Sequence, residues 1–147
     1  MSTTKRTMSC TPEDVFAVLS DGWAYATWVV GAARIRDVDA GWPKAGTKVH
    51  HSVGVWPLLL NDDTEVEVVE APQLLQMRVR AWPTGEGRVT LHLRAVGPGC
   101  EVVMEEQAVS GPAKKLPKPL QDLMLHPRNV EALRRLAFLA ENRARTP

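Results

Sequence analysis

An alternation of apolar and polar residues runs through the middle of the chain, from residue 29 to residue 109. Successive side chains of a β-strand point to opposite faces, so a period of two predicts strands that bury one face. The candidate strands cover residues 29–38, 48–56, 64–69, 74–82, 88–96 and 101–109. Residues 61–63 (Asn-Asp-Asp) and 97–99 (Gly-Pro-Gly) carry turn-forming side chains typical of hairpins. The pattern therefore predicts an antiparallel meander.

A first helix is predicted ahead of this meander. Residues 3–10 make a short candidate strand, and Thr11, Pro12, Glu13 and Asp14 follow it. A threonine hydroxyl can cap a helix, proline suits the first helical position, and carboxylates favour the positive end of the helix dipole. We therefore expect one or two short helices between the first strand and the meander.

A long helix is predicted at the C-terminal end, over residues 120–143. The apolar positions at helical spacing are Val130, Leu133, Leu136, Ala137 and Ala140. Pro127 lies inside this segment, where we expect it to kink the helix or to start a second one. Strands followed by a terminal helix indicate a single α+β domain over residues 1–147, in which the helix covers one face of a curved antiparallel sheet of six to seven strands.

Charge and hydropathy exclude several classes of protein. Eighteen basic residues face seventeen acidic ones, and this balance argues against a nucleic-acid binder. No apolar run approaches the roughly 20 residues that span a bilayer, so we expect no membrane insertion. The first ten residues lack the apolar centre of a signal peptide, and a cytoplasmic location is the default expectation.

The metal-ligating residue types are scattered. Cys10 and Cys100 lie far apart in the chain, which indicates buried reduced thiols. His50 and His51 are neighbours on a predicted strand, so they point to opposite faces and cannot chelate one ion together. The sequence also lacks a glycine-rich phosphate loop and a GxSxG motif. We therefore expect neither a metal site nor a cofactor.

The last predicted hairpin brings a carboxylate into an apolar face. A turn at Pro98-Gly99 pairs Leu91 with Glu106 and Leu93 with Met104, and directly opposed residues share a face. A loop one residue longer would reverse the faces. The apolar residues around Glu106 favour the version in which it points inward. A carboxylate there must be paired, solvated in a pocket or protonated.

The other strands are read in the same way. The predicted inward residues are Val49, Val53 and Val55, Val66 and Val68, and Leu75, Met77, Val79 and Ala81. His51 shares the inward parity of its strand, whereas Arg78 and Arg80 point outward. Residues 29–38 fit neither parity, which predicts a bulge. His51 and Glu106 are thus ionisable groups on a concave face, either satisfied locally near strand ends or lining a cavity.

Nearly the whole chain resembles a known superfamily. The residues that carry the resemblance are SCTPEDVFAVLSDGWAYATWVVG at 9–31, the meander, and RNVEALRRLAFLAE at 128–141. These stretches are similar to the START / Bet v 1-like superfamily, and more narrowly to bacterial polyketide cyclase/dehydrase-like (SRPBCC) proteins. They are signatures of a fold and carry no catalytic motif, so the resemblance transfers no catalytic residue.

The resemblance implies a helix-grip fold with an apolar cavity between the sheet and the terminal helix. Trp23, Tyr25 and Trp28 would then plug one end of the core or form a rim that contacts a ligand. The residues expected to line the ligand site are Trp23, Tyr25, Trp28, His51, Val53, Val66, Val68, Met77, Val79, Leu91, Leu93, Met104, Glu106, Leu120 and Met124.

Three functions fit this interpretation. The first is a carrier or sensor, monomeric or homodimeric, for a small apolar ligand of lipid, polyketide or aromatic type. The second is a cyclase or dehydratase in which His51 and Glu106 act as acid and base. The third is a protein-interaction module that uses Arg78, Arg80 and Arg94, although a solvated outer face balanced by Glu65, Glu67 and Glu105 is the more ordinary explanation of these arginines.

Overall fold

Seven strands form one sheet in the part of the chain that the computed structural model describes, residues 2–53, 57–81 and 85–145. The order is β1-β7-β6-β5-β4-β3-β2, and every neighbouring pair is antiparallel. The strands are β1 (Ser2–Met8), β2 (Ala32–Val38), β3 (Lys48–Val53), β4 (Leu60–Glu70), β5 (Leu74–Ala81), β6 (Gly85–Val96) and β7 (Gly99–Ser110).

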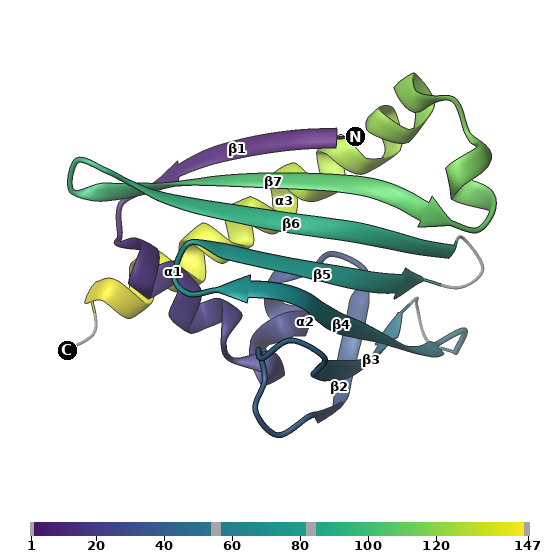
Figure 1. Cartoon of the computed structure of the whole chain (residues 1–147), viewed down its shortest axis with the longest axis horizontal. Helices are drawn as coiled ribbons and strands as arrows, with labels where there is room; N and C mark the ends of the chain where they lie inside the picture. The colour runs from purple at the N-terminus through teal and green to yellow at the C-terminus, as the bar shows by residue number, and fades with distance from the viewer. Residues whose placement is uncertain (1, 54–56, 82–84, 146–147) are drawn as a thin grey trace.

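The helices gather on one side of this sheet (Figure 1). They are α1 (Pro12–Leu19), the 3₁₀ turn η1 (Gly22–Ala24), α2 (Tyr25–Trp28), the 3₁₀ turn η2 (Pro112–Lys115) and α3 (Lys118–Arg145). The long helix α3 lies across the sheet, with α1 near its C-terminal end (Figure 1). This arrangement confirms the predicted α+β helix-grip fold.

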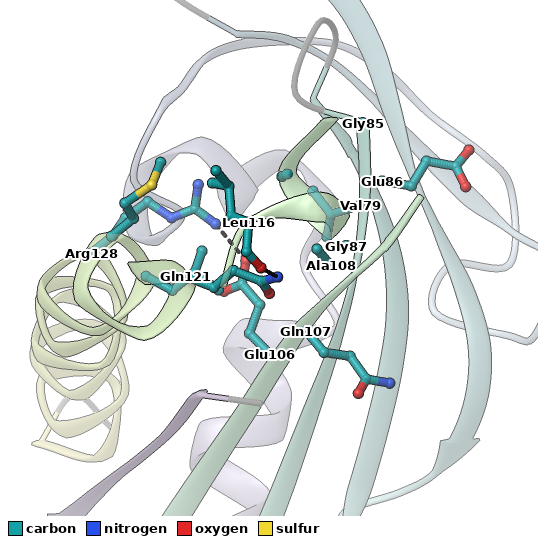
Figure 2. A pocket seen from close by; sticks show the side chains of 13 residues that line it. Val79, Gly85, Glu86, Gly87, Glu106, Gln107, Ala108, Leu116, Gln121 and Arg128 are labelled. Atoms are coloured by element: carbon teal, nitrogen blue, oxygen red, sulfur yellow. Dashed lines mark hydrogen bonds and ion pairs between the residues drawn. The ribbon is translucent and has the colours of Figure 1, made fainter. Parts of the chain in front are cut away.

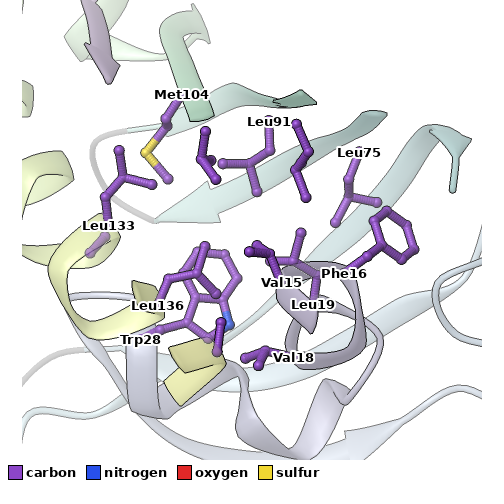
Figure 3. Close-up of a cluster of buried hydrophobic side chains, with 14 of the residues drawn as sticks. Val15, Phe16, Val18, Leu19, Trp28, Leu75, Leu91, Met104, Leu133 and Leu136 are labelled. Atoms are coloured by element: carbon purple, nitrogen blue, oxygen red, sulfur yellow. The ribbon is translucent and has the colours of Figure 1, made fainter. Parts of the chain in front are cut away.

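The start of α1 follows from local sequence. The Thr11 hydroxyl accepts a hydrogen bond from the Asp14 backbone N–H at 3.2 Å, and the Asp14 carboxylate accepts one from the Thr11 N–H at 3.1 Å. This reciprocal pair is a capping box, and Pro12 occupies the first turn as expected. Because the helix begins there, its buried side chains Val15, Phe16 and Leu19 point towards the sheet and α3 (Figure 3).

The core lies between the sheet, α1 and the C-terminal half of α3 (Figure 3). From α3 it takes Leu133, Leu136, Ala137 and Ala140, as the helical spacing predicted. Val130 does not join them, because the rotation of α3 buries Asn129 instead: Val130 is 42% exposed and Asn129 only 2%. The helix also runs through Pro127 as one element, so no second helix starts there. Pro127 lies on the exposed face of α3, where water can satisfy the carbonyl group that a proline leaves unpaired.

Pairing in the last hairpin differs from the prediction by two residues. Val96 pairs with Gly99 around a tight turn, so Leu91 lies opposite Met104 and Glu106 lies opposite Val89. The predicted pairing of Leu91 with Glu106 was therefore wrong. A slip of two residues leaves each side chain on its original face, and Glu106 is buried on the inner face as expected.

Two further strand predictions need correction. Residues 61–63, expected as a turn, lie inside β4, where Asp63 makes ion pairs with Lys48 and Arg80 on neighbouring strands. The register of β4 also shifts between Val66 and Val68, and this irregularity turns Val68 outward. The bulge predicted in β2 is confirmed by two register shifts against β3. The inward prediction for Val55 lies outside the described residues, and no side-chain position is described for Ala81.

Candidate functional site

Two adjoining hollows lie between the sheet and the N-terminal half of α3. The outer pocket has a volume of about 100 Å³ and the inner chamber about 30 Å³. The outer pocket (Figure 2) is lined by Val79, Gly85, Glu86, Gly87, Glu106, Gln107, Ala108, Ala113, Leu116, Gln121, Met124, Leu125 and Arg128. The inner chamber is lined by Tyr25, Trp28, Val29, Val30, Met77, Val79, Val89, Met104, Glu106, Arg128, Asn129 and Ala132.

An ion pair stands where the two hollows meet. Arg128 Nη2 on α3 donates to Glu106 Oε1 on β7 at 2.7 Å (Figure 2). The Glu106 side chain is 7% exposed, whereas the Arg128 side chain is 42% exposed. The buried carboxylate thus has the charged partner that its position demands, and the partner reaches it from the solvent side. Since both residues line both hollows, their side chains divide the space.

A hydrogen-bonded chain lies behind the inner chamber. The Tyr25 hydroxyl lies 2.6 Å from the Thr64 hydroxyl, which lies 3.0 Å from His51 Nε2. The Tyr25 ring stacks on the His51 ring at 5.3 Å and meets Trp28 edge-on at 5.7 Å. Burial raises the pKa of Tyr25 to about 12, and burial lowers the pKa of His51 against the opposing effect of Asp62 and Asp63. Both groups are therefore uncharged at neutral pH.

The structure brings about half of the predicted ligand residues to the hollows. Those that line them are Tyr25, Trp28, Met77, Val79, Met104, Glu106 and Met124. His51 lies one layer behind, covered by Tyr25. Val66, Leu91 and Leu93 are buried in the hydrophobic core and line neither hollow.

The remaining predicted residues lie away from the hollows. Trp23 is 59% exposed, because η1 buries its neighbour Gly22 against Val38 and directs the tryptophan outward. Leu120 is exposed in the first turn of α3, and Val68 points outward at the shift in β4. Val53 is half-buried at the end of β3 without lining either hollow.

The predicted pair of His51 and Glu106 does not form. Within the described residues, no hydrogen bond or ion pair joins them: His51 Nε2 contacts Thr64, and Glu106 Oε1 contacts Arg128. Arg134, the next arginine along α3, pairs instead with Glu131 on its own helix. Over the same residues, no group of three or more His, Cys, Asp or Glu side chains is placed to hold a metal ion.

Sequence reasoning missed Arg128 and Asn129 as site residues. A signal for Asn129 was present, because it falls in helical phase with Leu133, Leu136 and Ala140 and is polar at an inward position. No comparable signal marks Arg128, whose partner lies 22 residues away in the chain. Gly85 and Gly87 could have been recognised, because they continue the odd-numbered, inward-facing series of Val89, Leu91 and Leu93 in β6 and leave space there.

A curved antiparallel sheet that grips a long helix over partly apolar hollows defines the class of helix-grip, Bet v 1-like proteins. The family described as "Polyketide cyclase / dehydrase and lipid transport" matches residues 2–141, and the chain belongs to it. This confirms the resemblance to the START / Bet v 1-like (SRPBCC) superfamily seen in the sequence. No curated protein matches the chain at a significant level.

Solved structures with low sequence identity share the fold. Protein NE0264 from Nitrosomonas europaea has a TM-score of 0.72 at 14% identity, over 95% of this chain and 93% of that one. Ara h 8.0201 has a TM-score of 0.71 at 10% identity, over 94% and 95%. The di-domain ARO/CYC StfQ from the steffimycin biosynthetic pathway has a TM-score of 0.70 at 10% identity, over 96% of this chain and 44% of that protein. At these identities the likeness concerns the fold alone.

Proposed function

We propose that the protein binds a small apolar ligand between its sheet and α3, as a carrier or sensor. The observation that supports this proposal is the pair of adjoining hollows, whose walls combine apolar side chains with polar groups at defined positions. Membership in a family described by lipid transport and polyketide chemistry supports the same reading. Among the described helices, none is long and apolar enough to cross a membrane.

Ligand entry requires a local change of shape. Volumes of about 100 and 30 Å³ fall below the roughly 300–1,000 Å³ of typical ligand pockets. The Arg128 side chain is the obstacle closest to solvent, and water that enters the opened pocket would solvate the Glu106 carboxylate that it leaves. Its departure joins the two hollows into one space that reaches from η2 to Trp28.

The test uses freshly purified protein and a neutral fluorescent probe. We expect native mass spectrometry to find a bound small molecule, and N-phenylnaphthylamine to bind the protein after that molecule is removed. Gly87→Leu should abolish probe binding, since a Cβ there lies 3.5 Å from the Gln107 carbonyl oxygen and 3.8 Å from Glu106 Oε1. These are ordinary contact distances, so the added side chain fills the outer pocket without backbone strain.

Ala95→Leu is the matched control, because Ala95 lies on the same strand outside both hollows. It should leave probe binding unchanged. Equal binding to the wild type and Gly87→Leu, with no co-purified molecule, would reject the outer pocket as a ligand site.

An acid–base enzyme of the cyclase or dehydratase type is the second candidate. The observation in its favour is that the Glu106 carboxylate borders both hollows, where movement of Arg128 would free it to act on a bound molecule. A positioned carboxyl group of this kind contributes typically 10²–10⁴-fold to a rate. Turnover of a bound poly-β-ketone probe that Glu106→Gln abolishes, with binding retained, would favour the enzyme over the carrier.

The third function, a protein-interaction surface, draws little support from charge. Arg78 pairs with Glu67 and Glu86, and Arg94 pairs with Glu101. Arg80 likewise pairs with Glu86 and Asp63. The outer face of the sheet therefore carries balanced charges, which is the ordinary state of a solvated face.

A further inference from the structure

Asn129 is a buried amide with a donor to spare. It is 2% exposed, it lines the inner chamber, and its Nδ2 atom has no hydrogen-bond partner. Buried polar groups in folded proteins nearly always have a partner, and an unpaired donor costs stability. The neighbouring Val130 would have suited the apolar wall, but the rotation of α3 turns Val130 to solvent and buries the polar Asn129 in its place.

The polar groups around Asn129 are already engaged. The Tyr25 hydroxyl is hydrogen-bonded to Thr64, and the Arg128 guanidinium to Glu106. The rest of the chamber wall is apolar, with Trp28, Met77 and Met104 among its residues. The free Nδ2 donor is thus available to a molecule that enters the chamber.

We propose that Asn129 determines ligand specificity by donating a hydrogen bond to a neutral carbonyl oxygen at the buried end of the ligand. The apolar body of that ligand would lie against Tyr25, Trp28 and Met104. This inference rests on the proposed function, since it names the class of ligand that the hollows accept.

The charge balance of the chamber selects a neutral oxygen over a carboxylate. The buried Glu106 carboxylate is paired with the half-exposed Arg128 guanidinium. A ligand carboxylate in the chamber would lie near the Glu106 carboxylate, and the single Arg128 guanidinium could compensate only one of the two even if it stayed in place, which is strongly unfavourable. A ketone oxygen needs only the donor that Asn129 offers.

The experiment compares α-tetralone with tetralin, which differ by one carbonyl group. The affinity ratio of the two probes, measured by calorimetry, cancels the differences between variants in apolar packing. We expect Asn129→Leu to reduce the preference for α-tetralone by roughly fivefold to tenfold, the value of one hydrogen bond. Asn142→Leu makes the same change at an exposed position of α3 and should leave the ratio unchanged. In the wild type, the Asn129 side-chain amide NMR signal should shift with α-tetralone and not with tetralin.

Each outcome bears on one of the two proposals. If both probes bind and Asn129→Leu leaves their ratio unchanged, or the amide signal stays in place, Asn129 is not the donor and apolar binding still stands. If tetralin carboxylate binds wild-type protein more tightly than α-tetralone, the preference for a neutral oxygen is overturned. If no probe binds, the ligand-binding proposal is rejected, and the inference about Asn129 is rejected as well. The wild-type NMR measurement decides the case even if Asn129→Leu does not fold.

Discussion

The two halves of α3 lie over the same sheet and differ in what they cover. In the C-terminal half, Leu133 and Leu136 are fully buried in the core that the helix shares with α1. In the N-terminal half, Leu123 is 71% exposed, and the space beneath the helix is hollow. One helix therefore covers a packed core with one half and the two hollows with the other.

The sheet itself grades from large to small side chains beneath this helix. Inward positions of β6 carry Leu93 and Leu91 in the core, at the packed end, and then Val89, Gly87 and Gly85 at the hollow end, where they line the inner chamber or the outer pocket. The hollow therefore arises because the strands beneath it lack side-chain volume. It does not arise from poor packing of the helix, because protein interiors otherwise fill to near-crystalline density.

Truncation of one leucine in each half of α3 should give the largest difference in stability between the two halves. Leu136→Ala should lower the free energy of unfolding by about 3 kcal/mol, since the site is fully buried and leaves a cavity. Leu123→Ala makes the same chemical change at an exposed position and should cost about 0.5 kcal/mol or less. Urea unfolding measures both. Equal losses would show that the N-terminal half packs as tightly as the C-terminal half.

Removal of either partner of the Arg128–Glu106 ion pair tests how much this pair stabilises the part of the fold around the hollows. Arg128→Leu should cost about 3 kcal/mol, because it leaves the buried Glu106 carboxylate uncompensated. Glu106→Gln should cost only about 1 kcal/mol, because the exposed Arg128 can turn to solvent. The double variant should be more stable than Arg128→Leu alone. If Glu106→Gln lowers the free energy of unfolding more than Arg128→Leu does, then the arginine is the charge that needs a partner in the folded protein, and the carboxylate is not.

Acid should destabilise the region around the hollows, including β3 and α2, before it destabilises the core around α1. Burial lowers the pKa of His51 below its ordinary value of 6.5, so the unfolded chain takes up the proton first. Stability from this group is complete above pH 6.5 and declines as the pH falls towards the folded-state pKa. We expect part of the decline between pH 7 and 5 to vanish in His51→Gln. Amide exchange at pH 5 should increase in β3 and α2 before it increases in α1.

His92→Gln is the control for this titration, because His92 lies exposed on the outer face beside Glu105. The stability of the His92→Gln variant should change with pH in the same way as that of the wild type. Parallel curves for His51→Gln and the wild type would remove His51 as the acid-sensitive group.

Tryptophan fluorescence should show the smallest of these effects and locate the ligand within the hollow end. Trp28 is 3% exposed and lines the inner chamber, whereas Trp23 is 59% exposed. Trp28→Phe should therefore remove most of the signal change on probe binding, and Trp23→Phe should leave it intact. The reverse result would place the ligand near η1 and restore the idea that Trp23 forms part of the rim.

Much of the fold could be predicted because it depends on local periodicity. The alternation in β5, β6 and β7 set which side chains face the core, and the capping residues at Thr11 and Asp14 set where α1 begins. Glu106 was placed on the inner face correctly although its partner was wrong by two residues, because a shift of two preserves the face. The graded side chains of β6 were likewise present in the sequence.

The ion pair, the outward turn of Val68 and the burial of Asn129 were decided only by tertiary structure. Each depends on how one element is rotated or registered against another that is distant in the chain. The helical pattern of α3 allows either Asn129 or Val130 at the edge of its buried face, and only packing against the sheet selects between them. Local periodicity determines which face of an element is apolar, but the rigid-body placement that minimises exposed apolar area determines which residues meet across the hollow.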